Sequence, residues 1–406
     1  MSDSDTISIR VTNSVTDIGQ VRWDGLSNPK RGCEKSVSAE FDYNPFQSYN
    51  FFHALEESGS ACDNTGWHGQ HLIMETAPDA SQAPELLGIL PCYLKNHSQG
   101  EYVFDHGWAD AFERAGGHYY PKLQAAVPFT PATGRRLLVG NGSDAQKRRL
   151  MLAGGLQRVC EKLEVSSSHV TFLTNEDTEA FEAAEYLHRM DQQFHWLNDG
   201  YENFDQFLDA LSSRKRKNIR KERKAALDGN GITIEWLTGP ELTESIWDTF
   251  YEFYMDTGSR KWGRPYLTRK FFSMIGDTMA DDIVLIMAKR EGAYVAGAIN
   301  FIGSHTLFGR HWGCIEDHPY LHFEVCYYQA IDFAIAHKMH RVEAGAQGGH
   351  KLARGYMPQT THSAHYITHP GFRRAVGDYL EQERRAVLRE NELIAKHGPF
   401  KKGQEQ

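Results

Sequence analysis

Two parts of this chain repeat one order of predicted elements, in which short strands precede a helix and one more strand follows it. In the first half, residues 70–75, 85–94 and 135–139 have the pattern of strands. Residues 144–163 place apolar side chains three and four positions apart, as in an amphipathic helix, and residues 169–173 form another β-branched run. A chain with this order has to pack its helices on the faces of its sheets.

The second half follows the same order. Residues 283–288 and 294–302 are predicted strands joined by a hairpin-like turn, and residues 305–312 continue the sheet. An apolar helix over 323–337 and a strand over 341–344 come next. The fold class that this order predicts is α+β, with mostly antiparallel central sheets flanked by helices.

We place the domain boundary near residue 195, which gives an N-terminal domain 1–195 and a C-terminal domain 196–406. The second domain contains a helical, basic region near its start and a long charged helix at its end: residues 204–211, 214–224, 240–257 and 372–397.

Composition excludes several classes of protein. With 40% hydrophobic and 24% charged residues in 406 positions, the chain is predicted to fold into real cores. No apolar run approaches the roughly 20 residues that span a bilayer, so no membrane span is expected. The acidic, polar start of the sequence lacks the pattern of a secretory signal, and we therefore expect a cytoplasmic protein.

The cysteines and histidines show no metal-binding spacing. Six scattered cysteines without a C-x-x-C pair are expected to be reduced thiols, and the twenty histidines give no ligand cluster, so we predict neither a metal nor a tightly bound cofactor. A net charge of -9 argues against a protein that coats nucleic acid, although it leaves room for a local basic patch.

A glycine-rich turn with clustered cations follows the last strand of the second half, within residues 342–356. Glycines there let the backbone turn freely, and His350, Lys351 and Arg354 come directly afterwards. Backbone N–H groups and cations in such a turn suit a phosphate, a carboxylate or a developing oxyanion. The alternative is an ordinary turn whose charges are solvated.

A long insert over residues 94–131 mixes ionisable and aromatic side chains, which is typical of loops that bind something. We expect it to line a pocket for donor or substrate, and the same pocket to be lined by the glycine-rich turn. The alternative is that its rings extend the core and its charges form the rim. The residues that we assign to donor or substrate binding in this insert are Lys95, His97, Glu101, Asp105, His106, Trp108, Tyr120 and Lys122.

A basic run stands between Arg214 and Lys224, with eight basic residues in eleven positions and Ile219 as its apolar anchor. On a helix these charges cover most of the circumference, so the run has to face solvent or a polyanion. A tRNA backbone, the phosphates of coenzyme A or an anionic lipid-linked precursor would be attracted, and we assign Arg216 and Arg220 to such a contact. A solvated charged helix is the alternative.

Three segments carry a resemblance to a known family: YNPFQSYNFFHALEESGS (43–60), the stretch 93–131 and HFEVCYYQAIDFAI with VEAGAQGGHKLARGYMPQTTHSAH (within 322–365). They resemble the FemAB-like predicted N-acyltransferases, which belong to the wider GNAT superfamily, and the similarity covers residues 40–395.

The resemblance implies two tandem GNAT-like domains. It also implies transfer of an acyl or aminoacyl group, from acyl-CoA or aminoacyl-tRNA as co-substrate, to a small amine or a peptidoglycan precursor. Two departures stand out: Gly349 occupies a position where the family more often has Glu, and no Gln/Arg-x-x-Gly-x-Gly/Ala loop precedes the helix that begins near His322. The missing loop disfavours ordinary acetyl-CoA binding.

Amide formation needs a base beside the amine, and Glu343 is our first candidate, with Glu324 as the second. Glu324 has an alternative explanation as a charge favoured at a helix start. His350 and Lys351 would stabilise the oxyanion, and Arg354 would hold donor phosphates. The further residues that we assign to donor or substrate binding are Gln347, Arg310 and Trp312. The alternative function is a non-catalytic binding protein for a cell-wall precursor or tRNA.

Overall fold

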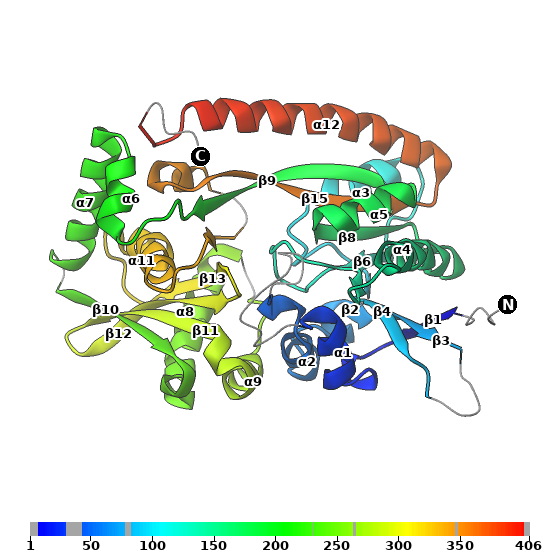
Figure 1. Cartoon of the computed structure of the whole chain (residues 1–406), viewed down its shortest axis with the longest axis horizontal. Helices are drawn as coiled ribbons and strands as arrows, with labels where there is room; N and C mark the ends of the chain where they lie inside the picture. The colour runs from blue at the N-terminus through cyan, green and yellow to red at the C-terminus, as the bar shows by residue number, and fades with distance from the viewer. Residues whose placement is uncertain are drawn as a thin grey trace. The chain divides into compact units, whose positions relative to one another are not determined.

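The structure is a computed structural model that describes residues 7–29, 43–77, 83–229, 231–262, 265–345 and 348–401 (Figure 1). The chain forms two compact units. Unit 1 consists of Met1–Asp191 and Thr361–Val387, and unit 2 of Gln192–Thr360 and Leu388–Gln406. Three long elements, β9 (Leu187–Leu197), β15 (Met357–Ile367) and α12 (Pro370–Lys396), contribute residues to both units.

Unit 1 contains two sheets. An antiparallel sheet has the order β1-β3-β4-β7, and a second group of strands has the order β15-β8-β6-β5-β2, in which only β6 and β8 are parallel. The strands are β1 (Ile7–Thr12), β2 (Trp67–Gly69), β3 (His71–Thr76), β4 (Leu86–Leu90), β5 (Tyr93–Lys95), β6 (Lys122–Ala125), β7 (Leu138–Val139) and β8 (Ser167–Leu173). The helices are α1 (Gln20–Ser27), α2 (Tyr49–Glu57), α3 (His106–Arg114), α4 (Ala145–Lys162) and α5 (Asn175–Ala183).

The predicted strand 85–94 is two strands in the structure, because Pro91 and Cys92 separate β4 from β5. Proline has no N–H to donate to a ladder, so the pairing is interrupted there. The two parts join different sheets, β4 pairing with β3 and β5 with β2. The prediction of one continuous strand was therefore wrong.

Two further predictions for this unit need correction. The insert 94–131 is not one long loop, since it contains α3 and β6. The predicted strand 135–139 is reduced to the two residues of β7. Arg135 and Arg136 precede it as buried side chains that donate hydrogen bonds to main-chain carbonyls, a role that their sequence pattern does not reveal.

Unit 2 is built on one sheet of order β10-β11-β12-β13-β14-β9, in which only β13 and β14 are parallel. Its strands are β10 (Ile232–Thr238), β11 (Ile283–Arg290), β12 (Ala293–Ile302), β13 (Thr306–Cys314), β14 (Arg341–Glu343) and the C-terminal part of β9. Both faces of β11 are covered, and its first six residues, all apolar, are buried.

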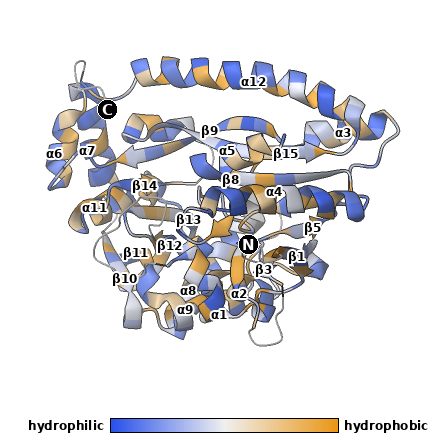
Figure 2. Cartoon of the chain, turned by 45° about the vertical axis from the view of Figure 1, so that its right-hand side comes forward, coloured by the Kyte–Doolittle hydropathy of each residue, from blue (hydrophilic) through white to orange (hydrophobic). Residues whose placement is uncertain are grey.

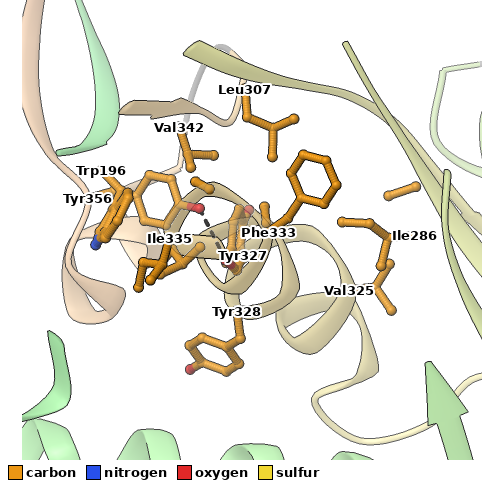
Figure 3. Close-up of a cluster of buried hydrophobic side chains, with 14 of the residues drawn as sticks. Trp196, Ile286, Leu307, Val325, Tyr327, Tyr328, Phe333, Ile335, Val342 and Tyr356 are labelled. Atoms are coloured by element: carbon orange, nitrogen blue, oxygen red, sulfur yellow. Dashed lines mark hydrogen bonds between the residues drawn. The ribbon is translucent and has the colours of Figure 1, made fainter. Parts of the chain in front are cut away.

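The helices of unit 2 are α6 (Phe204–Ala210), α7 (Ser213–Leu227), α8 (Glu244–Trp262), α9 (Arg269–Met279), α10 (Leu321–Phe323) and α11 (Gln329–Ala336). Between α10 and α11 the backbone forms a π-helical turn, Glu324–Tyr328, inside what the sequence predicts as one α-helix over 323–337. This turn carries Val325, Tyr327 and Tyr328 into the unit 2 core, where the Tyr356 hydroxyl bonds the Tyr327 carbonyl (Figure 3). π-Turns are rare and are frequent at functional sites.

These observations confirm the predicted fold class, an α+β chain with antiparallel-rich sheets flanked by helices. In Figure 2, hydrophilic and apolar residues alternate along α12, whose buried positions Val376 and Leu380 lie four residues apart. Within the described ranges, no helix combines the length and the apolar character that a membrane span requires.

Candidate active site

The parallel pair in the unit 2 sheet is short. Thr306–Phe308 of β13 pairs with Arg341–Glu343 of β14, and β13 then continues to Cys314 while β14 ends. The last residue of the short strand is Glu343, so this carboxylate lies at the position where the two parallel strands part.

The Glu343 side chain is buried, with 5% of its residue surface exposed. Burial raises its pKa to about 7, against the opposing charge of Arg341. Its Oε2 atom has no hydrogen-bond partner among the described residues. A carboxyl group that exchanges its proton near neutral pH and keeps one oxygen free has the properties of a general base.

The turn after β14 is held closed by Lys351, which was predicted to stabilise an oxyanion. Its Nζ donates to the carbonyl oxygens of Ala344 (2.7 Å) and Gly345 (2.9 Å), and the side chain is buried. Gly345 and Gly348 have positive φ angles of 74° and 125°, which side-chain-bearing residues rarely adopt. Because its ammonium is engaged with these carbonyls, we assign Lys351 to fixing the turn rather than to chemistry.

His350 and Arg354 extend from the 3₁₀ helix Gly349–Arg354 in that turn. His350 is exposed, and its Nε2 lies 2.8 Å from the Tyr327 hydroxyl of the π-helical turn. Arg354 is buried, donates to the His350 carbonyl (2.8 Å) and to Glu222 Oε2 (2.8 Å), and stacks on Phe323. Its guanidinium is thus engaged within the protein, which leaves His350 as the accessible ionisable group. Burial and the charges of Lys351 and Arg354 lower the pKa of His350, so its neutral form is favoured. Gln347 lies outside the described residues.

Glu324, the second candidate for the base, is fully buried and saturated with donors. Arg223 meets its two oxygens at 3.2 and 2.9 Å, and Gln329 Nε2 donates to it at 2.8 Å. The same guanidinium also bonds Asp332 at 2.7 Å. A carboxylate held at both oxygens by a cation is a poor base. Because Arg223 belongs to the basic helix α7, its bonds to Glu324 attach that helix to the core.

The basic run lies in α7, and its cations other than Lys215 and Arg223 fall into two groups. Arg216 and Arg220, predicted to hold a polyanion, instead form ion pairs with Asp209 (2.7 Å) and Asp205 (3.1 Å), carboxylates of the neighbouring helix α6 (Figure 1). A second group of exposed cations shows no ion pair within the described chain: Arg214, Lys217, Lys221 and Lys224. Their spacing of three, four and three places them in one row along the helix.

Arg310 and Trp312 lie on β13 beyond its pairing with β14, and both are partly buried. The Trp312 ring meets His322 edge-on at 5.4 Å. His322 in turn contacts His350 and Tyr327. The structure therefore brings Trp312 into one ring cluster with His350, on the side of unit 2 where β14 ends.

In unit 1, five of the eight residues assigned within the insert are buried: Lys95, Glu101, Asp105, Trp108 and Lys122. Lys122 Nζ donates to Ser98 Oγ (2.8 Å), to Glu101 Oε2 (2.7 Å) and to Asp105. Burial opposes its charge, but the Glu101 and Asp105 carboxylates raise the pKa of Lys122 above its ordinary value. Lys122 thus bonds one oxygen of each carboxyl in the interior, where the sequence analysis expected these groups to line a pocket. Glu101 Oε1 and Asp105 Oδ1 are buried and have no hydrogen-bond partner among the described residues.

The remaining members of the insert have separate surroundings. Lys95 lies 3.6 Å from the centre of the Trp67 ring, and burial lowers its pKa to about 7. His97 bonds the Thr65 carbonyl, and Tyr120 bonds the Ser98 hydroxyl. His106 is exposed at the start of α3.

Four histidines that the sequence analysis did not assign are buried: His71, His169, His195 and His365. His195 on β9 lies directly opposite Glu343, and its Nδ1 is 3.9 Å from Glu343 Oε1. In unit 1, His169 of β8 and His365 of β15 meet Nδ1 to Nδ1 at 2.7 Å. Alternation along a strand predicts which of these histidines point inward, but only strand pairing shows what they face.

Two cavities are lined by other residues. A cavity of about 350 Å³ in unit 1 includes Glu56, Cys62, Trp67 and Tyr93, and an open one of about 700 Å³ in unit 2 includes Trp236 and Gln329. None of the predicted site residues lines either cavity. The glycine-rich turn belongs to unit 2 and the insert to unit 1, so their sharing of one pocket stays a prediction.

Metal binding has no support in the part of the chain that the structure describes, where no group of three or more His, Cys, Asp or Glu side chains is arranged to hold an ion. The cysteines within those ranges are free thiols: Cys62, Cys92, Cys160, Cys314 and Cys326.

Comparisons with known proteins place the fold. The crystal structure of FemX superposes with a TM-score of 0.50 at 11% identity and covers 84% of this chain and 96% of its own. A conserved protein of unknown function from Bacteroides thetaiotaomicron gives 0.49 at 10% identity, with 88% and 99% covered, and L-PGS from Bacillus licheniformis gives 0.46 at 9%, with 85% and 99% covered. At such identity the likeness to FemX shows the fold alone.

The sequence itself matches the FemAB-like family, described as peptidoglycan biosynthesis/recognition, over residues 14–402. No curated protein matches it. The chain belongs to the FemAB-like family. This confirms the resemblance drawn from the sequence.

Proposed function

We propose that this protein transfers an acyl or aminoacyl group from an activated ester or thioester donor to an amine acceptor. The acceptor in this proposal is a peptidoglycan precursor or a small amine. Family membership supports the reaction class. The observation that carries the chemistry is Glu343, a buried carboxyl with a pKa of about 7 and a free oxygen at the end of β14.

In the proposed step the amine nitrogen attacks the carbonyl carbon of the donor. A C–N bond forms, the bond from carbon to the leaving oxygen or sulfur breaks, and Glu343 takes the proton that the nitrogen loses. The leaving oxygen or sulfur gains a proton from solvent and departs as a hydroxyl or thiol. Glu343 later releases its own proton to solvent, which regenerates the carboxylate. His350, exposed beside this strand end, is the candidate for stabilising the oxyanion.

Donor phosphates are assigned to the row on α7 formed by Arg214, Lys217, Lys221 and Lys224. These side chains are exposed and have no acidic partner among the described residues. Cations about 5–6 Å apart along a helix match a ligand that carries several phosphates. The assignment replaces that of Arg216 and Arg220, whose charges α6 already balances.

The test is an assay of donor turnover that requires an amine. Charged tRNA and acyl-CoA are each incubated with a panel of amines, and release of deacylated tRNA or free thiol is measured for the wild type and for Glu343→Gln. We expect Glu343→Gln to lower the rate at least about 100-fold, since general bases contribute 10²–10⁴-fold, with donor binding unchanged.

Wild-type turnover in Glu343→Gln would remove this residue from the mechanism. Donor binding by the wild type without product from any amine would instead favour the non-catalytic binding protein.

A further inference from the structure

Glu343 faces one buried side chain across the sheet. In the antiparallel pair of β14 and β9 it lies opposite His195, and the two residues have 5% and 4% of their surfaces exposed. The Glu343 Oε1 and His195 Nδ1 atoms are 3.9 Å apart. A hydrogen bond between them requires the two atoms to approach by roughly 1 Å.

The proton on His195 can be assigned from its other contact. Its Nε2 lies 3.1 Å from Gln193 Oε1, an oxygen that can only accept, so Nε2 carries the hydrogen. Burial, together with the charges of Arg341 and Lys351, lowers the pKa of His195 to about 3, so the ring is neutral. Nδ1, which lies 3.9 Å from Glu343 Oε1, therefore carries a lone pair.

The carboxyl group has little else to bond. Oε2 has no partner within the described residues, and the nearest cation, Arg341, lies 3.9 Å from Oε1 with its side chain 46% exposed. A lone pair facing a carboxylate is unfavourable, whereas the same lone pair facing a carboxylic acid accepts its hydrogen. His195 thus favours the protonated form of Glu343, and Arg341 favours the ionised form.

We propose that His195 is a positioning residue whose Nδ1 accepts the hydrogen of the protonated Glu343 carboxyl, and so retains the proton that Glu343 takes from the amine. This inference rests on the proposed role of Glu343 as the base. His195 touches neither donor nor acceptor in it and acts only through Glu343.

The experiment is a titration of the Glu343 carboxyl in the full-length protein, followed by ¹³C NMR and assigned with Glu343→Gln. His195→Phe keeps an aromatic ring at this position but removes the acceptor nitrogen. We expect the midpoint of the Glu343 titration to fall by about half to one pH unit, which is the equivalent of one ordinary hydrogen bond. Arg341→Gln is the matched control and should raise the midpoint. An unchanged or higher midpoint in His195→Phe would overturn the proposal.

A second measurement needs no variant. The ¹⁵N shifts of the His195 ring in the wild type should show a neutral ring with its hydrogen on Nε2 from pH 5 to pH 8. A ring protonated on Nδ1 in that range would overturn the proposal even if His195→Phe failed to fold.

The two hypotheses fail separately. If Glu343→Gln keeps full turnover while His195→Phe shifts the titration, the base assignment is wrong and the pairing is supported. The opposite result is that Glu343→Gln abolishes turnover, while His195→Phe shifts neither the Glu343 titration nor the acidic limb of the pH–rate profile. Glu343 is then supported as the base, and the positioning role of His195 is wrong.

Discussion

The guanidinium of Arg223 meets the carboxylate of Glu324 at two points, Nε to Oε2 at 3.2 Å and Nη2 to Oε1 at 2.9 Å. Glu324 is completely buried at the start of the π-helical turn, and Arg223 belongs to the basic helix α7. This ion pair ties the most charged segment of the chain to the core of unit 2. It explains how α7, which has few apolar residues such as Ile219, packs against the core of unit 2.

Removal of Arg223 should therefore destabilise the protein. In Arg223→Met the Glu324 carboxylate stays buried without a counter-charge, and we expect the free energy of unfolding to fall by about 3–5 kcal/mol. Urea denaturation at neutral pH measures the change. Arg220→Met, on the same helix but in the exposed pair with Asp205, should cost less than about 1 kcal/mol. Equal losses in the two variants would contradict the anchoring role.

The row of unpaired cations on α7 predicts a salt-dependent contact with the donor. Replacing Arg214, Lys217 and Lys221 with Gln should weaken binding of a phosphate-rich donor at least about tenfold. It should also lower the slope of log Kd against the logarithm of the salt concentration by roughly two. Fluorescence anisotropy with labelled tRNA, and competition with acyl-CoA, measure both effects. The control Arg216→Gln/Arg220→Gln loses two charges from paired positions, against three in the row, and should leave the slope nearly unchanged. A larger effect in the control would refute the row.

The sequence predicted the fold class, most of the strands in the second half, and the position of Glu343 at the end of a strand. These features could be predicted because they depend on local periodicity. It could not predict pairing between distant segments. Arg216 and Arg220 looked like ligands for a polyanion until their α6 partners were known, and Lys122 looked like a pocket residue although Glu101 and Asp105 enclose it. Tertiary contacts decide which charged side chains face solvent. The periodicity of the sequence does not reveal those contacts.

The raised pKa of Glu343 gives a stability prediction with a definite sign. An ordinary Glu ionises near 4.5, and Glu343 in the folded protein near 7, so between these values the unfolded chain releases a proton that the folded chain keeps. Ionisation therefore lowers the free energy of unfolding as pH rises from about 4.5 to about 7, by roughly 3 kcal/mol in all. Glu343→Gln removes this loss.

Urea denaturation of both proteins between pH 4 and pH 8 tests that sign. The stability of Glu343→Gln relative to the wild type should grow with pH and level off above about pH 7. A difference that is independent of pH would show that Glu343 ionises in the folded protein as it does in the unfolded chain.

The buried cluster around Lys122 predicts a coupled loss in unit 1. Lys122→Met keeps all but the last atom of the side-chain length and leaves Glu101 and Asp105 without their shared cation. These two residues have 4% and 3% of their surfaces exposed. We expect a loss of about 3–5 kcal/mol at neutral pH, because a buried carboxylate without a partner costs more than the pair contributes. The loss should shrink as pH falls, since protonation of the two carboxyl groups removes the uncompensated charge.

Adding Asp105→Asn to Lys122→Met should restore at least about 1 kcal/mol of the free energy of unfolding, and a double-mutant cycle measures that recovery. Additive losses in the cycle would show that Lys122 and Asp105 act independently.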